Sequence, residues 1–331
     1  MTNVRAIVSH EHGDPVEVAR VESRDLAAPG PRQALVRMAS APINPADLNK
    51  IEGRYGNEPG PLPAVGGGEG AGVVEAIGAE VRGVRAGDMV ILPGTVGTWC
   101  EACLVDAAAL IVVPPGIAPE HAAMLRVNPA TALRMLRDMV PLQPGEWVLL
   151  NAANSAVGRA TIQLARVLGL RTLSLVRREE LLADMRALGG DAVLLDDEAW
   201  PAAARDILGE AAPRLALNAV GGDSALRLAK VLAPGGTVVT YGAMGRQPLR
   251  IPNGLLIFKD IRWRGFWVSQ WFREAGAEAL AAMWGELFAH AQTGLLRAPV
   301  EAVYPLEACA EALAHAQQGG RGGKILFRCT A

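Results

Sequence analysis

The middle of the chain alternates β-like and α-like segments, and this alternation constrains the fold more than any other feature. Continuous apolar runs typical of buried strands stand at 146–152, 171–176, 192–197, 213–222 and 235–242. Segments with helical periodicity lie between them at 158–169, 179–190 and 224–233. Such alternation predicts βαβ units, and therefore a doubly wound parallel sheet with helices on both faces. We expect residues 261–269 to add a sixth strand.

The flanking segments have a different texture. Residues 1–117 contain short β-like runs separated by glycine and proline, most densely at 56–72, which predicts a β-barrel-type domain. The tail is expected to form a helix, a strand, a second helix and a final strand. The simplest arrangement returns residues 270–331 to the domain of residues 1–117. The nucleotide-type domain, residues 118–269, is then an insertion.

Composition excludes several classes of function. Lysine and arginine total 32, aspartate and glutamate total 34, and the formal net charge is −2. This balance offers no basic excess for a nucleic acid. No apolar run is long enough to span a membrane, so we expect no membrane partner. The first residues have no signal-peptide pattern, from which we expect a cytoplasmic protein of bacterial type.

The four cysteines do not have the spacing of a metal site. Cys100 and Cys103 form one C-x-x-C pair within a strand-like segment, and Cys309 and Cys329 do not repeat that spacing. Tetrahedral zinc takes four ligands, and the five histidines do not supply the missing pair. We therefore expect no metal, and interpret these cysteines as small apolar residues in or near a core.

The turn after the first strand of the alternating region is a candidate dinucleotide site. The segment 151–159 reads NAANSAVGR, and only Gly158 remains of the glycine fingerprint. Its position, between the first strand and the first helix of a βαβ series, is where a pyrophosphate binds. Ser155, Ala156 and Val157 would offer backbone N–H groups there. A plain strand-to-helix connection is the alternative.

The end of the second strand indicates which cofactor is bound. An NAD site has an acidic residue there for the ribose hydroxyl, whereas this chain has Arg177 and Arg178. Two guanidinium groups suit the 2′-phosphate of NADP(H). The alternative is a solvated basic helix start, although cations are unfavourable at that end of the helix dipole.

Eight segments together resemble a known family over nearly the whole chain. They are INPADLNKIEGRYG (43–56), GGEGAGVVEAIG (67–78), RVNPATALRML (126–136), NAANSAVG (151–158), LALNAVGG (215–222), TYGAM (240–244), LIFKDIRWRGFWVSQW (256–271) and GGKILF (322–327). The chain resembles the zinc-free medium-chain dehydrogenase/reductase superfamily, most of all the 2-enoyl thioester reductases of mitochondrial fatty-acid synthesis type. The resemblance implies a Rossmann domain inserted into a GroES-like catalytic domain, and a homodimer.

The resemblance also bears on zinc. The zinc-dependent members carry a ligand cysteine near residues 44–47 and a histidine directly before the glutamate that corresponds to Glu69. This chain has Gly68 in place of that histidine, and no cysteine in the first segment. The resemblance therefore implies a metal-free enzyme in which Glu69 is structural.

The resemblance further implies a set of cofactor and substrate contacts. Those to the cofactor would come from Asn128, Thr131, Asn154, Ser155, Ala156, Val157, Arg177, Arg178, Tyr241, Gly242, Ala243, Met244, Phe266, Trp267, Val268, Ser269 and Lys324. The substrate pocket would include Asn44 and Trp267. Four residues depart from the family pattern. Ala156 adds a methyl group where glycine is usual, and Arg126, where a small residue is usual, has no assigned role. Arg178 and Glu179 depart from the family's R-D-R, so of this motif only Arg177 carries over.

Tyr55 is the expected proton donor. In these reductases hydride from NADPH adds to C3 of the enoyl thioester, and a tyrosine in the segment that maps to Tyr55 protonates C2. A phenol with a pKa of about 10 is neutral at pH 7 and can donate. The expected substrate is an acyl thioester of coenzyme A or of acyl carrier protein. Two alternatives remain: an NADPH:quinone reductase, and a non-catalytic nucleotide-binding protein in which Tyr55 is an ordinary loop residue.

Overall fold

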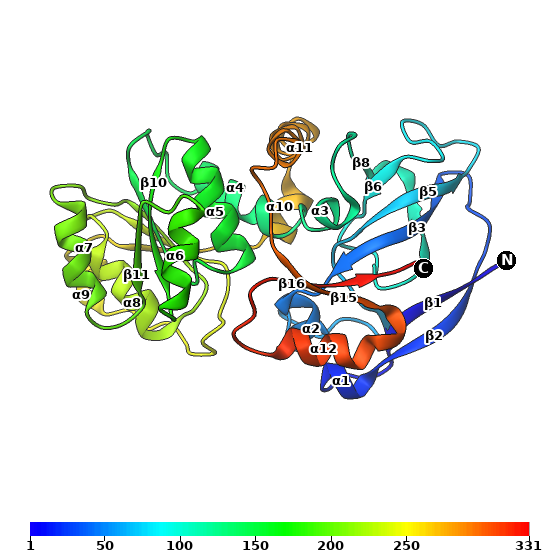
Figure 1. Ribbon diagram of the computed structural model, residues 1–331, viewed down its shortest axis with the longest axis horizontal. Coiled ribbons are helices and arrows are strands. Elements are labelled where there is room, and N and C mark those ends of the chain that lie inside the picture. The colour runs from blue at the N-terminus through cyan, green and yellow to red at the C-terminus, as the bar shows by residue number, and fades with distance from the viewer. Residues whose placement is uncertain (331) are drawn as a thin grey trace. The chain divides into compact units, whose positions relative to one another are not determined.

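The computed structural model describes residues 1–330, and the chain divides into two compact units (Figure 1). The first unit contains residues 1–127 and the segment from Phe288 onward, and the second contains Asn128–Leu287. Each unit therefore has its own core. The domain boundaries expected from the sequence, after 117 and after 269, remain a prediction, since the compact units divide after 127 and 287.

The second unit is built on one parallel sheet. Its strands are β9 (Trp147–Leu150), β10 (Arg171–Val176), β11 (Ala192–Leu195), β12 (Leu215–Asn218), β13 (Thr237–Thr240) and β14 (Arg262–Gly265). The strand order is β11-β10-β9-β12-β13-β14. From β9 the chain adds β10 and β11 on one side and then β12, β13 and β14 on the other side. This is the strand order of a Rossmann dinucleotide-binding domain. The predicted fold class is confirmed.

Helices precede, connect and follow these strands, and three of them are absent from the sequence-based prediction. They are α4 (Asn128–Asp138), α5 (Ala156–Val167), α6 (Glu180–Ala187), α7 (Trp200–Leu208), α8 (Gly222–Val231), α9 (Asn253–Ile257), α10 (Val268–Glu274) and α11 (Ala277–Gln292). The unpredicted helices are α7, α9 and α10, of which α7 supplies the crossover that the parallel strands β11 and β12 require. Asp197 accepts hydrogen bonds from the backbone N–H groups of Ala199 and Trp200, which fixes its start.

The sixth strand is shorter than expected. The sequence predicts a strand over residues 261–269, but β14 ends at Gly265, and Val268 and Ser269 already belong to α10. The expected cofactor contacts at 266–269 therefore lie at a strand-to-helix junction. Aromatic and β-branched residues continue as far as Val268, so composition alone does not mark where the strand ends.

The first unit contains two antiparallel-rich sheets. Its strands are β1 (Thr2–Ser9), β2 (Ala19–Leu26), β3 (Gln33–Pro42), β4 (Ala64–Val65), β5 (Ala71–Ile77), β6 (Met89–Ile91), β7 (Ala102–Asp106), β8 (Ile111–Val112), β15 (Val300–Pro305) and β16 (Lys324–Arg328). The small sheet has the order β2-β1-β4. The large sheet has the order β15-β16-β3-β5-β6-β8, with β7 paired to β3. The C-terminal strand β16 thus pairs with β3, near the other end of the chain.

Short helices cover this unit. They are α1 (Pro15–Val18), α2 (Pro45–Ile51), α3 (Pro119–Ala123) and α12 (Cys309–Gln317), with single 3₁₀ turns at Ala107–Ala109 and Leu306–Ala308. Helix α12, near the C-terminus, packs against α1, near the N-terminus (Figure 1). No helix within residues 1–330 is both long and apolar enough to cross a membrane.

The core of the first unit explains part of its glycine-rich segment. Trp99 is fully buried and meets the ring of Phe327 edge to face, with ring centroids 5.2 Å apart. A Cβ atom at Gly66 would lie 2.2 Å from the Trp99 ring. Glycine is therefore required at 66 because the indole packs directly on the backbone. It is a packing position as well as part of a turn.

Candidate active site

The turn between β9 and α5 has the geometry of a pyrophosphate site. Ser155 caps α5, and its hydroxyl accepts a hydrogen bond from the Gly158 N–H at 3.1 Å. A Cβ atom at Gly158 would lie 2.5 Å from the Ala153 carbonyl oxygen, so the helix can start this close to the turn only with glycine there. The backbone N–H groups at this helix end can bind an anion. The one glycine retained from the fingerprint is thus the one that the close helix packing requires.

Tyr241 connects this turn to the loop after β13. Its backbone N–H donates to the Asn218 carbonyl at 3.0 Å, and the Ser155 side chain lies close enough to its phenol to influence the pKa of that group. Burial raises the pKa of the Tyr241 phenol well above its usual value, and the Ser155 side chain opposes this rise. Tyr241 therefore stays neutral at ordinary pH. Its position suits a residue that lines a cofactor site.

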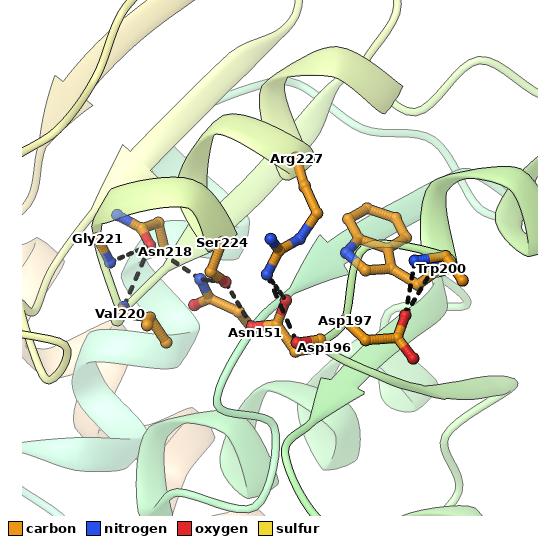
Figure 2. A network of polar contacts seen from close by, with 10 residues as sticks. Asn151, Asp196, Asp197, Trp200, Asn218, Val220, Gly221, Ser224 and Arg227 are labelled. Carbon is orange, nitrogen blue, oxygen red and sulfur yellow. Dashed lines mark hydrogen bonds and ion pairs between the residues drawn. The ribbon is translucent and has the colours of Figure 1, made fainter.

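A buried amide network supports the turn from below (Figure 2). The Asn151 amide nitrogen donates to Asn218 Oδ1 at 2.9 Å and to the Ser224 hydroxyl at 2.8 Å. Asn151 Oδ1 accepts from the Ala219 N–H at 2.8 Å, and Asn218 Oδ1 also accepts from the Gly221 N–H at 3.0 Å. These bonds tie the carboxyl ends of β9 and β12 together, at the edge where ligands bind in such sheets.

An ion pair extends the network to the end of β11. The Ser224 hydroxyl donates to Asp196 Oδ2 at 2.5 Å, and Arg227 donates to Asp196 Oδ1 at 2.8 Å (Figure 2). The Asp196 side chain is only 4% exposed, so these two partners compensate a buried charge. The sequence analysis did not identify these three residues. The available signal was that polar residues directly follow three successive apolar strands.

The two arginines after β10 differ in their surroundings. Arg178 lies 3.1 Å from the Glu180 carboxylate. Arg177 is exposed at the end of β10 and forms no ion pair with any residue in 1–330. Arg177 is therefore available for an anionic ligand, whereas Arg178 already has a carboxylate beside it.

The remaining expected contacts divide between the two units. Asn128 and Thr131 are buried in the first turns of α4, whereas Met244 and Trp267 are 54% and 40% exposed. All expected cofactor residues except Lys324 belong to the second unit. Tyr55, Asn44 and Lys324 belong to the first.

The first unit buries a charged cluster around Asn44. The Asn44 amide nitrogen donates to Glu69 Oε1 at 2.7 Å, and the Lys324 ammonium donates to Asn44 Oδ1. Glu69 Oε2 accepts from the Val127 N–H at 2.8 Å. Asp47 joins the cluster by accepting the Asn44 N–H at 2.9 Å, which also fixes the start of α2. The two residues expected in the site, Asn44 and Lys324, are therefore in direct contact.

Burial and charge act against each other in this cluster. Burial raises the pKa of Glu69 and of Asp47 and lowers the pKa of Lys324, while the attraction between these opposite charges counteracts each shift. Burial likewise lowers the pKa of Arg126, and Glu69 opposes that change. Arg126, which the sequence left without a role, is thus a second cation beside Glu69.

Tyr55 follows α2 on a turn between two glycines. Gly53 and Gly56 have φ angles of 69° and 89°, a conformation that favours glycine. The Tyr55 ring is half-buried, and the Lys50 ammonium lies 5.6 Å from its centroid. Tyr304, the tyrosine of β15, shares a hydrogen bond of 2.9 Å with His315.

Comparisons with known proteins agree with this geometry. Residues 30–124 match the family model of the alcohol dehydrogenase GroES-like domain, and residues 156–284 match that of the zinc-binding dehydrogenases. The mitochondrial enoyl-[acyl-carrier-protein] reductase of Rattus norvegicus is 43% identical over 318 residues, which is 94% of this chain and 85% of the relative. The enzyme of that name from Homo sapiens is 43% identical over 310 residues, covering 92% of this chain and 83% of the relative.

The chain belongs to the enoyl-[acyl-carrier-protein] reductase family of the medium-chain dehydrogenase/reductases. Solved structures agree. The complex of Etr1p with NADP and crotonyl-CoA superposes with a TM-score of 0.90 at 27% identity, covering 99% of this chain and 100% of that one. A putative NADPH:quinone reductase from Bacillus thuringiensis superposes with a TM-score of 0.93 at 26% identity, covering 99% of both chains.

The name of one family model raises the question of zinc in this reductase. In place of cysteine and histidine ligands, the first unit has Asn44, Asp47, Gly68 and Glu69, with the Lys324 ammonium hydrogen-bonded to Asn44. A lysine cation among the carboxylates leaves no zinc-type donor set. Within residues 1–330 no group of three or more His, Cys, Asp or Glu side chains could hold a metal, and all four cysteines are buried and free. These residues do not fit a zinc site.

One expectation about this reductase is wrong. The sequence analysis expects a cytoplasmic protein of bacterial type, but the curated relatives with 43% identity are named as mitochondrial enzymes. The expectation depended on the first residues alone, and that segment is too weak a basis for it.

The buried network predicts a specific loss of stability. Ser224→Ala removes a hydroxyl that both accepts from Asn151 and donates to Asp196, so buried partners lose a hydrogen bond. We expect the free energy of unfolding, measured by urea denaturation, to fall by about 1–3 kcal/mol. The NADPH dissociation constant should rise, because the turn at Asn151 loosens.

Ser174→Ala is the matched control. Its hydroxyl is also buried in the second unit, on β10, but has no hydrogen-bond partner within residues 1–330. This substitution should change the unfolding free energy by no more than about 0.5 kcal/mol. Equal losses in the two variants would show that the network at Ser224 contributes nothing specific.

Proposed function

We propose that this chain is an NADPH-dependent reductase of the C2–C3 double bond of 2-enoyl thioesters. The observation that carries the proposal is 43% identity to an enoyl-[acyl-carrier-protein] reductase along 94% of the chain. A similar structure, that of Etr1p, holds NADP and crotonyl-CoA. The two units contain a nucleotide turn of the right kind and a tyrosine on a glycine-flanked loop, both of which this reaction needs.

In this proposal each unit supplies a separate part of the chemistry. Bound NADPH supplies the hydride that adds to C3. The α5 start at Ser155 binds the pyrophosphate, and Arg177 binds the 2′-phosphate through charge-assisted hydrogen bonds. Tyr55 donates its phenolic proton to C2, which completes the addition of two hydrogens across the double bond. The remaining expected cofactor contacts, including Lys324, belong to this proposal.

A quinone reductase is the second candidate, and the Bacillus thuringiensis structure favours it. Steady-state NADPH oxidation with crotonyl-CoA, longer enoyl-CoA substrates and quinones separates the two. Rapid quinone reduction with no turnover of any enoyl thioester would replace our proposal. Failure to bind NADPH would leave only a non-catalytic protein with this fold.

The role of Tyr55 predicts a large effect from one oxygen atom. Tyr55→Phe removes the proton donor and leaves the ring, so we expect kcat for crotonyl-CoA to fall at least tenfold. This corresponds to a loss of at least ~1.4 kcal/mol of transition-state stabilisation. The NADPH dissociation constant should be unchanged. Tyr304→Phe is the control, because its hydroxyl bonds to His315. An unchanged rate for Tyr55→Phe would remove it from the mechanism.

The 2′-phosphate contact predicts a change in cofactor preference. Arg177→Ala should raise KM for NADPH at least tenfold and leave KM for NADH nearly unchanged, because only NADPH has the phosphate. Arg178→Ala should have a smaller effect, since Glu180 already neutralises that guanidinium. Equal changes for the two cofactors in Arg177→Ala would mean that other residues recognise the phosphate.

We further propose that the chain forms a homodimer through β14. This strand lies at the edge of the six-stranded sheet, and an edge strand can pair with a second copy of itself. Just before it, Leu256, Ile257 and Phe258 are 44%, 69% and 87% exposed. The mitochondrial 2-enoyl thioester reductase Etr1p/Etr2p of Candida tropicalis, 28% identical with a TM-score of 0.89 and covering 99% of this chain and 100% of that one, is a heterodimer.

This interface can be tested by light scattering. Phe258→Asp places a charge on the apolar face, so the molar mass should fall from that of a dimer to that of the 34.7 kDa monomer. Met244→Asp is a control, since it is also exposed but lies on the loop after β13. A Phe258→Asp protein that remains dimeric would exclude this face.

A further inference from the structure

Trp267 and Arg273 form an exposed stacked pair at the end of the parallel sheet. Trp267 is the second residue after β14 and is 40% exposed. The Arg273 side chain, from the exposed surface of α10, folds back so that its guanidinium carbon lies 4.7 Å from the centroid of the indole. Stacking on an aromatic face holds a guanidinium in place while its N–H groups remain free at the edges.

Among residues 1–330, no carboxylate forms an ion pair with Arg273, and the adjacent Glu274 accepts a hydrogen bond from Gln270 at 2.7 Å. Two other arginines stack on a tryptophan in the same way. Arg134 lies 4.8 Å from the Trp271 ring, but its guanidinium also binds Asp138, with one bond of 2.8 Å. Arg171 lies 4.0 Å from the Trp147 ring, but Asp191 is 3.7 Å away from its guanidinium. Of these three stacked arginines within residues 1–330, only Arg273 is an oriented cation available for an external anion.

The anion for Arg273 is a different group from the one proposed for Arg177. Arg177 follows β10, and β10 lies four strands away from β14 in the sheet order. With neighbouring strands ~4.8 Å apart, the ends of β10 and β14 are about 19 Å apart. The pyrophosphate that we place at the α5 start follows β9, which lies three strands, or about 14 Å, from β14. The anions of the cofactor are therefore assigned to other residues, and the anion for Arg273 is one of the other reactant.

We propose that Trp267 and Arg273 recognise the phosphopantetheine arm of the thioester substrate. This inference rests on the proposed function, since it concerns the carrier of the acyl group. The arm has a gem-dimethyl group and methylene links between its two amides, which can lie on the exposed indole, and a phosphate that pairs with the guanidinium. Coenzyme A and acyl carrier protein both carry this arm, so the pair determines specificity for carrier-bound substrates over free thioesters.

The test compares substrates with and without the phosphate. Arg273→Ala should raise KM for crotonyl-CoA about tenfold, which corresponds to ~1.4 kcal/mol. The kcat/KM for the N-acetylcysteamine thioester of crotonate, which has no phosphate, should be unchanged. Arg273→Lys should recover part of the loss, because it keeps the charge but not the planar fork. Arg134→Ala is the control, and should affect both substrates alike.

Two further substrates distinguish the source of the phosphate. Crotonyl-3′-dephospho-CoA lacks the phosphate of the CoA ribose but keeps that of the arm, so Arg273→Ala should raise its KM as much as for crotonyl-CoA. Crotonyl-acyl carrier protein should show the same loss. If the effect disappears with the dephospho compound, Arg273 contacts the ribose phosphate and the proposal is wrong. Equal losses for crotonyl-CoA and the N-acetylcysteamine thioester would also overturn it.

A binding measurement separates this inference from the proposed function. Isothermal titration of free coenzyme A needs no turnover, and its dissociation constant should rise about tenfold in Arg273→Ala. If the protein reduces no enoyl thioester but shows this difference, the recognition site stands and the proposed reaction fails. Coenzyme A binding that is equal in wild type and Arg273→Ala overturns the recognition site, whatever the activity.

Discussion

The arrangement of the second unit depends on hydrogen bonds between the buried polar groups at the carboxyl ends of its strands. Asn151 has an amide that cannot reach water, and it pairs with Asn218 and Ser224. Each of these partners belongs to a different segment, so one side chain sets the spacing between the cofactor turn and the loop after β12. The Asp196–Arg227 pair continues this arrangement to β11. The geometry of the dinucleotide turn is thus fixed by buried side chains beneath the binding surface.

The first unit uses charge for a similar purpose. The Lys324 ammonium comes from the last strand, and Asn44 and Glu69 come from segments far earlier in the chain. A buried cation and carboxylate bridged by an amide fix α2 against the sheet, and Tyr55 follows α2 directly. Where the zinc-dependent members have a ligand cysteine and a ligand histidine, this chain has residues 44–47 and Gly68, and the Lys324 ammonium is hydrogen-bonded to Asn44. The metal-free chemistry that we propose agrees with this set of side chains.

Much of the fold was predictable because it depends on local patterns. The parallel strands are short apolar runs, and Gly158 and the arginines after β10 stand at positions fixed by the βαβ unit. Helix α7 and strand β2 were not predicted. Helix α7 is only nine residues long and contains Pro201, which is typical of a helix break. Strand β2 has no alternation, because half of its residues are exposed and only Ala19 is buried. The Ser224–Asp196 contact and the Arg178–Glu180 pair depend on distances that one sequence does not contain.

The pairing of β16 with β3 has a consequence for the order in which the protein forms during synthesis. The second unit is one continuous segment, so its sheet can assemble as soon as residue 287 has left the ribosome. The first unit cannot complete its large sheet until the final strand is made, some 280 residues after Asn44. Until then, the edge of β3 that later pairs with β16 has unpaired backbone N–H and C=O groups. A chaperone has its longest opportunity to bind there, and a prematurely terminated chain would expose that edge permanently.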